Sequence, residues 1–177
     1  VEWNVVDGQI LPNLALRSGA EEACGFLDEA GRCQIHAYRP GICRLFPLGR
    51  FYENGSFQYF LQIHECKKEK RTKVKVKKWI DTPDLKQYEA YISRWHYFLK
   101  DIRTAETEAA QKLLAEPCTG TAQEQEIQKK NRAAAAAERE KRRNLLIMKL
   151  FYLLPYDGKK DFYEQFEKRM QMAERSL

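Results

Sequence analysis

The chain has 177 residues, of which 44% are hydrophobic and 32% charged, proportions typical of a folded globular protein rather than of a disordered tail. Its 31 Lys and Arg residues outnumber 25 Asp and Glu residues, which gives a formal net charge of +6. The most apolar window, residues 145–154, contains Lys149 and is far shorter than the roughly 18 apolar residues that a membrane-spanning helix requires. The sequence therefore excludes a helical membrane protein and, without a secretory signal pattern, predicts a cytoplasmic one.

Two β-hairpins are predicted in the first third of the chain. Residues 3–11 are centred on an Asp-Gly pair, and residues 49–63 on an Asn-Gly pair, both of which tolerate the positive φ angles of two-residue hairpin turns. From Phe57 to Ile63, apolar residues alternate with mostly polar ones. This period of two predicts a half-buried second strand.

Between the hairpins, residues 24–48 contain three cysteines and several glycines and prolines. Such a segment buries little apolar surface of its own, so we expect a bound metal to order it. The chain has five cysteines, and four of them fall within the first 66 residues. Without a secretory signal, a thiolate metal site is favoured over disulfides, while unbound buried thiols remain the other alternative.

The remainder of the chain is predicted to be helical. Thr82 as the cap and Pro83 at the first helical position begin a helix of about 20 residues. Its apolar residues from Leu85 to Ile102 recur every three or four positions and predict one buried face. Further helices are predicted over the polar, alanine-rich residues 123–143 and after residue 158.

These elements predict an α+β fold with a cysteine-bearing hairpin region followed by a mostly helical C-terminal half. We place the division at residue 80, so that residues 1–80 form the cysteine-cluster region and residues 81–177 the helical region. No window supplies the alternating strands and helices of a doubly wound nucleotide-binding fold.

The spacing of the cysteines leaves the identity of the metal open. Eight, nine and 22 residues separate Cys24, Cys33, Cys43 and Cys66 in turn, whereas about two residues separate the paired thiols of a zinc finger. Four thiolates can close a tetrahedral zinc site or hold an iron–sulfur cluster, and the residues do not choose between them. Cys118, far from the others in a polar loop, is interpreted as an ordinary thiol.

Charged and imidazole side chains near these cysteines are candidates for supporting roles. Arg39 and Arg44 would offset the negative charge of a thiolate cluster and lower the thiol pKa values; the alternative is that both are surface residues. His36 and His64 each lie two or three residues from a cysteine and are possible ligands, although hydrogen bonding is the more common role of such a histidine.

A specific resemblance begins at the first of these cysteines. Residues 24–47 carry the pattern C-x-F-L-x(3)-G-x-C-x-I-H-x-x-R-P-x-x-C-R-x-F-P. This resembles the signature of the YkgJ-type cysteine-cluster family, bacterial proteins described as zinc- or iron-chelating. The resemblance implies metal-ligand roles for Cys24, Cys33, Cys43 and Cys66.

Members of this family also carry an earlier block, roughly C-x-x-C-x-x-C-C, upstream of the matched pattern. The chain lacks that block and opens at Val1, so we expect it to be a fragment of a longer protein. One branch of the family consists of flagellin lysine methylases, which makes protein lysine N-methylation the alternative function.

A dense basic run follows the second hairpin. Residues 67–78 contain eight basic residues and one acidic residue, Glu69. Within this run, residues 72–77 alternate lysine with threonine or valine. The alternation predicts a basic strand, suited to an acidic protein partner or to a solvated sheet edge. Nucleic acid is the weaker interpretation because no aromatic residues interleave the lysines, and no membrane partner is expected.

The common catalytic motifs are missing. There is no glycine-rich phosphate loop, no G-x-S-x-G and no H-E-x-x-H. The leading prediction is therefore a metal-binding protein that holds zinc or an iron–sulfur cluster through cysteine thiolates. A lysine methyltransferase and a basic adaptor without metal are the alternatives, and the sequence leaves open whether the protein is an enzyme.

Overall fold

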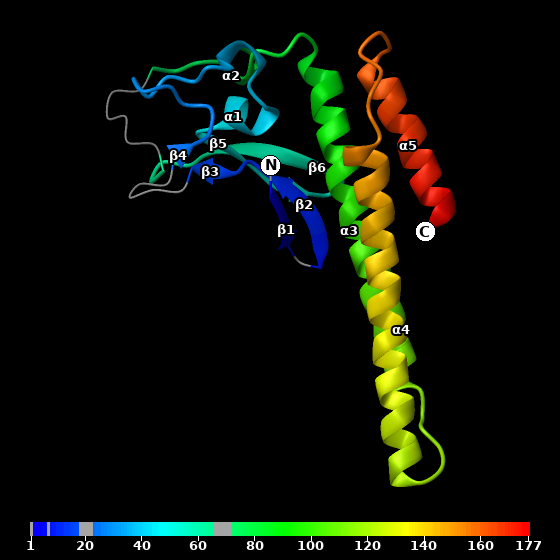
Figure 1. Cartoon of the computed structure of the whole chain (residues 1–177). Helices are drawn as coiled ribbons and strands as arrows, with labels where there is room; N and C mark the ends of the chain where they lie inside the picture. The colour runs from blue at the N-terminus through cyan, green and yellow to red at the C-terminus, as the bar shows by residue number, and fades with distance from the viewer. Residues whose placement is uncertain (1, 7, 18–22, 66–71) are drawn as a thin grey trace. The chain divides into compact units, whose positions relative to one another are not determined.

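The computed structural model describes residues 2–6, 8–17, 23–65 and 72–177. Short antiparallel strand pairs dominate the first part of the chain and helices the second (Figure 1). This confirms the predicted α+β class. Among the described residues, no helix combines the length and the apolar character that crossing a membrane would require.

The chain divides into two compact units, which are described separately. The first unit contains residues 1–15 and 100–177, and the second contains residues 16–99. The predicted division at residue 80 was drawn from sequence patterns alone and stays a prediction.

The second unit contains the cysteine segment and the second predicted hairpin. Strand β3 (Leu16–Arg17) pairs with β4 (Ala23–Cys24), and β5 (Leu48–Glu53) pairs with β6 (Ser56–Leu61), both antiparallel. The turn between β5 and β6 has φ angles of 50° and 76° at Asn54 and Gly55. These positive angles are the reason for the Asn-Gly pair, and the hairpin is confirmed.

One face of the β5–β6 hairpin packs on the first half of α3 (Leu85–Ala115). The Tyr52 ring stacks on His96 with centroids 3.5 Å apart, and the Tyr97 hydroxyl donates to the Ser56 carbonyl at 2.9 Å. Arg50 donates to the Tyr88 hydroxyl at 2.9 Å. Its guanidinium lies 5.3 to 5.9 Å from three aromatic ring centres, those of Phe57, Tyr59 and Tyr88.

Helix α3 differs from its prediction at its start and in its burial. The Asp84 carboxylate accepts from the Gln87 N–H at 2.9 Å, so Asp84 caps the helix and the predicted cap at Thr82 is wrong. The predicted apolar face is half-buried, and within it only the intervening Phe98 is buried, at 6% exposure. A two-stranded hairpin is too narrow to cover a face of this length.

The predicted basic strand over residues 72–77 is also wrong for the residues described. Residues 72–75 have no regular structure, and α2 (Val76–Ile80) follows them. The Lys75 carbonyl accepts from the Lys78 and Trp79 N–H groups, while Ile80 is 1% exposed and anchors the helix. Burial of this one side chain needs a helical turn, whereas a strand would need a neighbouring strand to pair with.

In the first unit, strand β1 (Glu2–Val6) pairs with β2 (Gln9–Asn13), which confirms the first hairpin. Its turn is held by helix α4 (Ala122–Met148). Arg143 and Asn144 both donate to the Gly8 carbonyl, at 2.8 and 2.9 Å. The two side chains are 4% and 6% exposed, so these bonds are shielded from water.

The helices of this unit follow their predicted order. The second half of α3 and helix α4 run side by side in opposite directions, and Arg139 pairs with Glu106 at 3.6 Å (Figure 1). Thr121 and Glu124 form a capping box at the start of α4. A π-helical turn (Lys149–Leu153) leads towards α5 (Phe162–Ser176), which buries Phe166 and Met170.

Candidate metal centre

Local hydrogen bonds bring the first two motif cysteines onto adjacent backbone segments. The Cys24 carbonyl accepts from the Leu27 N–H at 3.1 Å, and Leu27 forms a β-bridge with Cys33. The intervening turn passes through Gly31 at a φ of 73°, and the Asp28 carboxylate accepts from the Arg32 N–H at 2.7 Å. The glycine in the motif is therefore required by the turn geometry.

The third motif cysteine lies on a short helix, α1 (Gly41–Leu45), that follows a 3-10 turn (His36–Tyr38). Arg44 holds these pieces together by donating to three backbone carbonyls. It reaches Ala37 and Arg39 at 3.2 Å each, and Asp81 at the end of α2 at 2.7 Å. Its neighbour Cys43 is exposed.

The other two described motif cysteines act electrostatically on Cys43. The pKa of the Cys43 thiol is raised, first by loss of part of the water around its sulfur and then by the nearby thiols of Cys24 and Cys33. The Arg39 guanidinium acts in the opposite direction and lowers the pKa of Cys43. Cys24 and Cys33 are half-buried.

The remaining predicted site residues are placed as follows. Arg39 Nη1 lies 2.9 Å from Nε2 of His36, so both side chains belong to the turn that precedes Cys43. His64 is exposed in a turn after β6. Cys66, the fourth predicted ligand, lies outside the described residues.

The described residues do not form a closed metal site. Within the ranges that the structure describes, no group of three or more His, Cys, Asp or Glu side chains could hold a metal ion. The motif contributes three described cysteines, and thiolates are ligands for both zinc and iron. The donor chemistry therefore suits either metal, while the described ligand set is incomplete.

Cys118 belongs to the first unit and has a different environment. Its sulfur accepts from Nη1 of Arg132 at 3.6 Å, and the same guanidinium lies 3.5 Å from the Glu116 carboxylate. Arg132 also donates to backbone carbonyls of this loop. The Cys118 thiol is therefore one of several groups in this loop that Arg132 binds.

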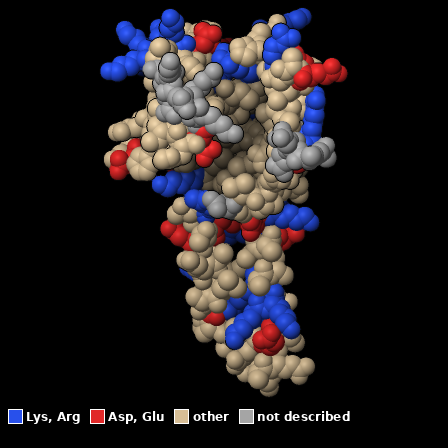
Figure 2. All heavy atoms as spheres, turned by 90° about the vertical axis from the view of Figure 1, so that its left-hand side faces the viewer, with Lys and Arg blue, Asp and Glu red and all other residues tan. Residues whose placement is uncertain are grey.

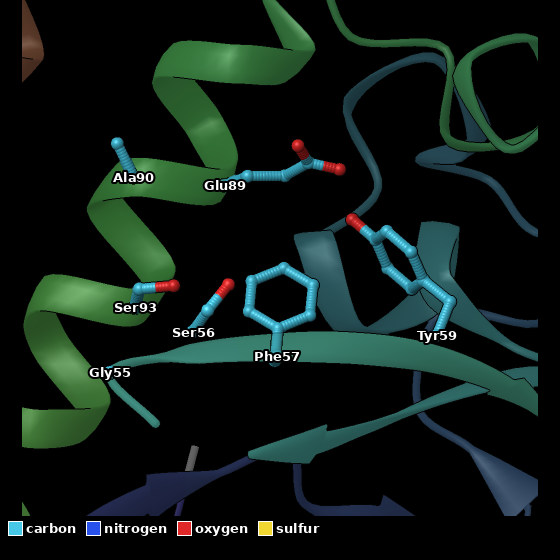
Figure 3. A pocket seen from close by; sticks show the side chains of 7 residues that line it. All are labelled: Gly55, Ser56, Phe57, Tyr59, Glu89, Ala90 and Ser93. Atoms are coloured by element: carbon cyan, nitrogen blue, oxygen red, sulfur yellow. The ribbon is translucent and has the colours of Figure 1, made fainter. Parts of the chain in front are cut away.

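A second feature of the cysteine-bearing unit was not predicted. A cavity of about 390 Å³ lies between the β5–β6 hairpin and α3, and its lining is shown in Figure 3 (Gly55, Ser56, Phe57, Tyr59, Glu89, Ala90 and Ser93). The Tyr59 hydroxyl is buried without a hydrogen-bond partner among the described residues. Burial raises the pKa of Tyr59 to about 12, with a further contribution from the facing Glu89 carboxylate.

This cavity could hold water or a small polar molecule. Its walls come from a hairpin and a helix that are about 30 residues apart in the sequence. No motif marks these residues, because the cavity exists only after the hairpin has packed on α3.

Basic side chains occur in several separate groups on the face drawn in Figure 2, with acidic side chains between them. Among the described residues several ion pairs link helical neighbours, such as Arg142 with Glu138 at 3.2 Å and Lys130 with Glu126 at 3.6 Å. The net positive charge is therefore not gathered into a single surface on this face.

Comparison with known proteins is informative for the cysteine-bearing part of the chain. Residues 4–77 match the family model CxxCxxCC, described as a putative zinc- or iron-chelating domain. No curated protein and no solved structure matches the chain. The match includes all four cysteines that the sequence pattern singled out, and it confirms the cysteine-cluster resemblance. Over residues 4–77 the chain is therefore similar to the CxxCxxCC family, whose description is a putative zinc- or iron-chelating domain.

Proposed function

We propose that Cys24, Cys33 and Cys43 supply thiolate ligands to a single zinc ion or iron–sulfur centre, with Cys66 as the fourth ligand. The observation that carries this proposal is that the backbone holds Cys24 and Cys33 on adjacent segments, through the bridge between Leu27 and Cys33, and that the thiols of both raise the pKa of Cys43. The family description supports the choice of zinc or iron.

The local environment supports a site that takes up metal with release of protons. A thiol must lose its proton to bind a metal, and desolvation together with the two neighbouring thiols raises the pKa of Cys43, which favours its protonated form. Arg39 opposes this by favouring the thiolate. Metal affinity should consequently fall as the pH is lowered.

A bound metal would link segments that few other contacts connect. Within residues 24–48, only Leu45 is buried. Thiolate bonds from β4, from the turn after Gly31 and from α1 would join the three segments directly. The proposed role of the metal is therefore at least structural, whatever chemistry the centre supports.

The test is metal content after anaerobic purification, measured by elemental analysis and by visible absorption, which an iron–sulfur cluster produces and zinc does not. We expect Cys43→Ser to lose most of its metal relative to the parent protein. Cys118→Ser is the matched control and should keep it. Full metal content in Cys43→Ser, with unchanged far-ultraviolet circular dichroism, would contradict the proposal.

A further inference from the structure

Two short helices of the cysteine-bearing unit lie side by side and expose apolar side chains. Helix α1 contacts α2, and the Trp79 indole N–H donates to the Phe46 carbonyl at 3.1 Å. Phe46 follows Ile42 by one helical turn, since its N–H donates to the Ile42 carbonyl. The exposed fractions are 65% for Ile42, 49% for Phe46 and 41% for Trp79.

Lysines border this apolar patch. Lys75, Lys77 and Lys78 are exposed, and among the described residues none of them forms an ion pair. The Lys75 carbonyl accepts from the N–H groups of both Lys78 and Trp79, so the lysines and the indole belong to the same helical turn. We call Ile42, Phe46, Trp79 and these three lysines the α1–α2 surface.

We propose that the α1–α2 surface docks an acidic segment of a partner protein that carries an apolar side chain between its carboxylates. The carboxylates complement the three lysines, which pair with no acidic side chain among the described residues, and the apolar side chain would cover Trp79 and Phe46. Charge complementarity supplies the selectivity, while burial of the aromatic rings supplies the affinity.

The geometry favours a protein segment over the other polyanions. Because the indole N–H of Trp79 donates to the backbone carbonyl of Phe46, just after α1, the ring is fixed to its own unit and does not project freely, as a side chain that inserts into a bilayer would. A nucleic acid backbone would engage the lysines but leave Ile42 without a partner. Lipid and nucleic acid are therefore competing outcomes of the test.

The experiment measures binding of a fluorescein-labelled 12-residue peptide made of glutamates around a central Leu-Phe pair, by anisotropy with the full chain. We expect saturable binding that Lys77→Glu/Lys78→Glu weakens at least tenfold. Lys129→Glu/Lys141→Glu, which makes the same charge change on the exposed part of α4, should bind like the parent protein.

The apolar half of the surface is tested separately. Ile42→Ser changes an exposed side chain, so folding should persist, and we expect it to weaken peptide binding about threefold. A peptide of glutamates alone should bind more weakly than the Leu-Phe peptide. Lys77→Gln/Lys78→Gln removes both positive charges without adding negative ones. We expect it to weaken peptide binding while its circular dichroism spectrum stays that of the parent protein, which would show that the loss comes from the lysines and not from misfolding.

Three outcomes would overturn the proposal. The first is no binding of the Leu-Phe peptide to the parent protein. The second is equal weakening by the α2 and α4 charge reversals, which would show a general effect of net charge. The third is tighter binding to vesicles of anionic phosphatidylserine and phosphatidylcholine, or to a 12-nucleotide oligothymidine, than to the peptide.

Discussion

At the scale of single residues, the two arginines of the cysteine motif, Arg39 and Arg44, have different roles. The Arg44 guanidinium donates to three backbone carbonyls, two in the 3-10 turn region and one at the end of α2. Arg39 instead lies close enough to Cys43 to lower the pKa of that thiol. A guanidinium has five N–H donors in a fixed plane and can bind carbonyls that point in different directions. An arginine of the motif can therefore stabilise the backbone around a site as well as the negative charge of its thiolates.

The effect of Arg39 can be measured on protein freed of metal. Replacing Arg39 with Gln removes the positive charge that favours the Cys43 thiolate, so the already raised pKa should rise further. At a pH below that pKa, alkylation of Cys43 by iodoacetamide should slow by about threefold, which corresponds to half a pKa unit.

Arg32→Gln is the control for this experiment. Arg32 is next to Cys33 in the sequence but pairs with Asp28 at 3.4 Å. The Arg32→Gln substitution should leave the pH dependence of Cys43 alkylation unchanged. If this pH dependence moved to lower pH in Arg39→Gln, the proposed lowering of the Cys43 pKa by Arg39 would be wrong.

At the scale of elements, a buried arginine joins α5 to the end of the π-helical turn. Arg169 is 6% exposed and donates to the carbonyls of Leu150, Leu154 and Pro155, all at 2.7 Å. Its guanidinium lies 3.5 Å from the centre of the Tyr156 ring. The carbonyls that a helix end leaves without partners are satisfied here by one side chain.

Arg169→Met should therefore be costly although it keeps much of the side-chain volume. Removing the guanidinium leaves up to three shielded carbonyls without donors, so we expect a loss of about 2–4 kcal/mol in the free energy of unfolding. Urea denaturation followed by circular dichroism measures it. Arg175→Met, exposed on the last turn of the same helix, should change stability by less than about 0.5 kcal/mol.

Elements with strong local signals were predictable, and an element without one was not. The Asn54-Gly55 pair marked its hairpin because few other residues accept those φ angles. Residues 72–77 alternated like a strand, but alternation becomes a strand only if another strand pairs with it. Burial of Ile80 favoured a helical turn instead.

At the scale of the whole molecule, order in the cysteine segment and order in the helices have different sources. Residues 24–48 bury a single large side chain, Leu45, whereas α5 buries Phe166, Met170 and Ala173 within eight residues. Ordering a residue costs about 1–2 kcal/mol of backbone entropy, and a structural metal can contribute on the order of 10 kcal/mol. The cysteine segment is the part of the chain that depends on such a contribution.

Metal removal should thus loosen one region selectively. On treatment with a chelator, we expect amide hydrogen exchange to accelerate across residues 24–48 while protection of α4 and α5 stays within about twofold. Mass spectrometry of peptic fragments resolves the two regions. Unchanged protection across residues 24–48 would show that packing alone orders the segment and that its cysteines are ordinary thiols.

The sequence by itself determined the α+β class, both hairpins, the order of the main helices and the family resemblance of the cysteine region. These features depend on local chemistry: positive φ at Gly55, the 3.6-residue period that buries Met170, and a cysteine pattern read directly from residues 24–47. Only the tertiary structure decided that Cys24 and Cys33 raise the pKa of Cys43, that Arg44 binds carbonyls rather than thiols, and that a cavity opens beside Tyr59. Each of these depends on segments distant in sequence meeting through packing, and residue spacing carries no information about such contacts.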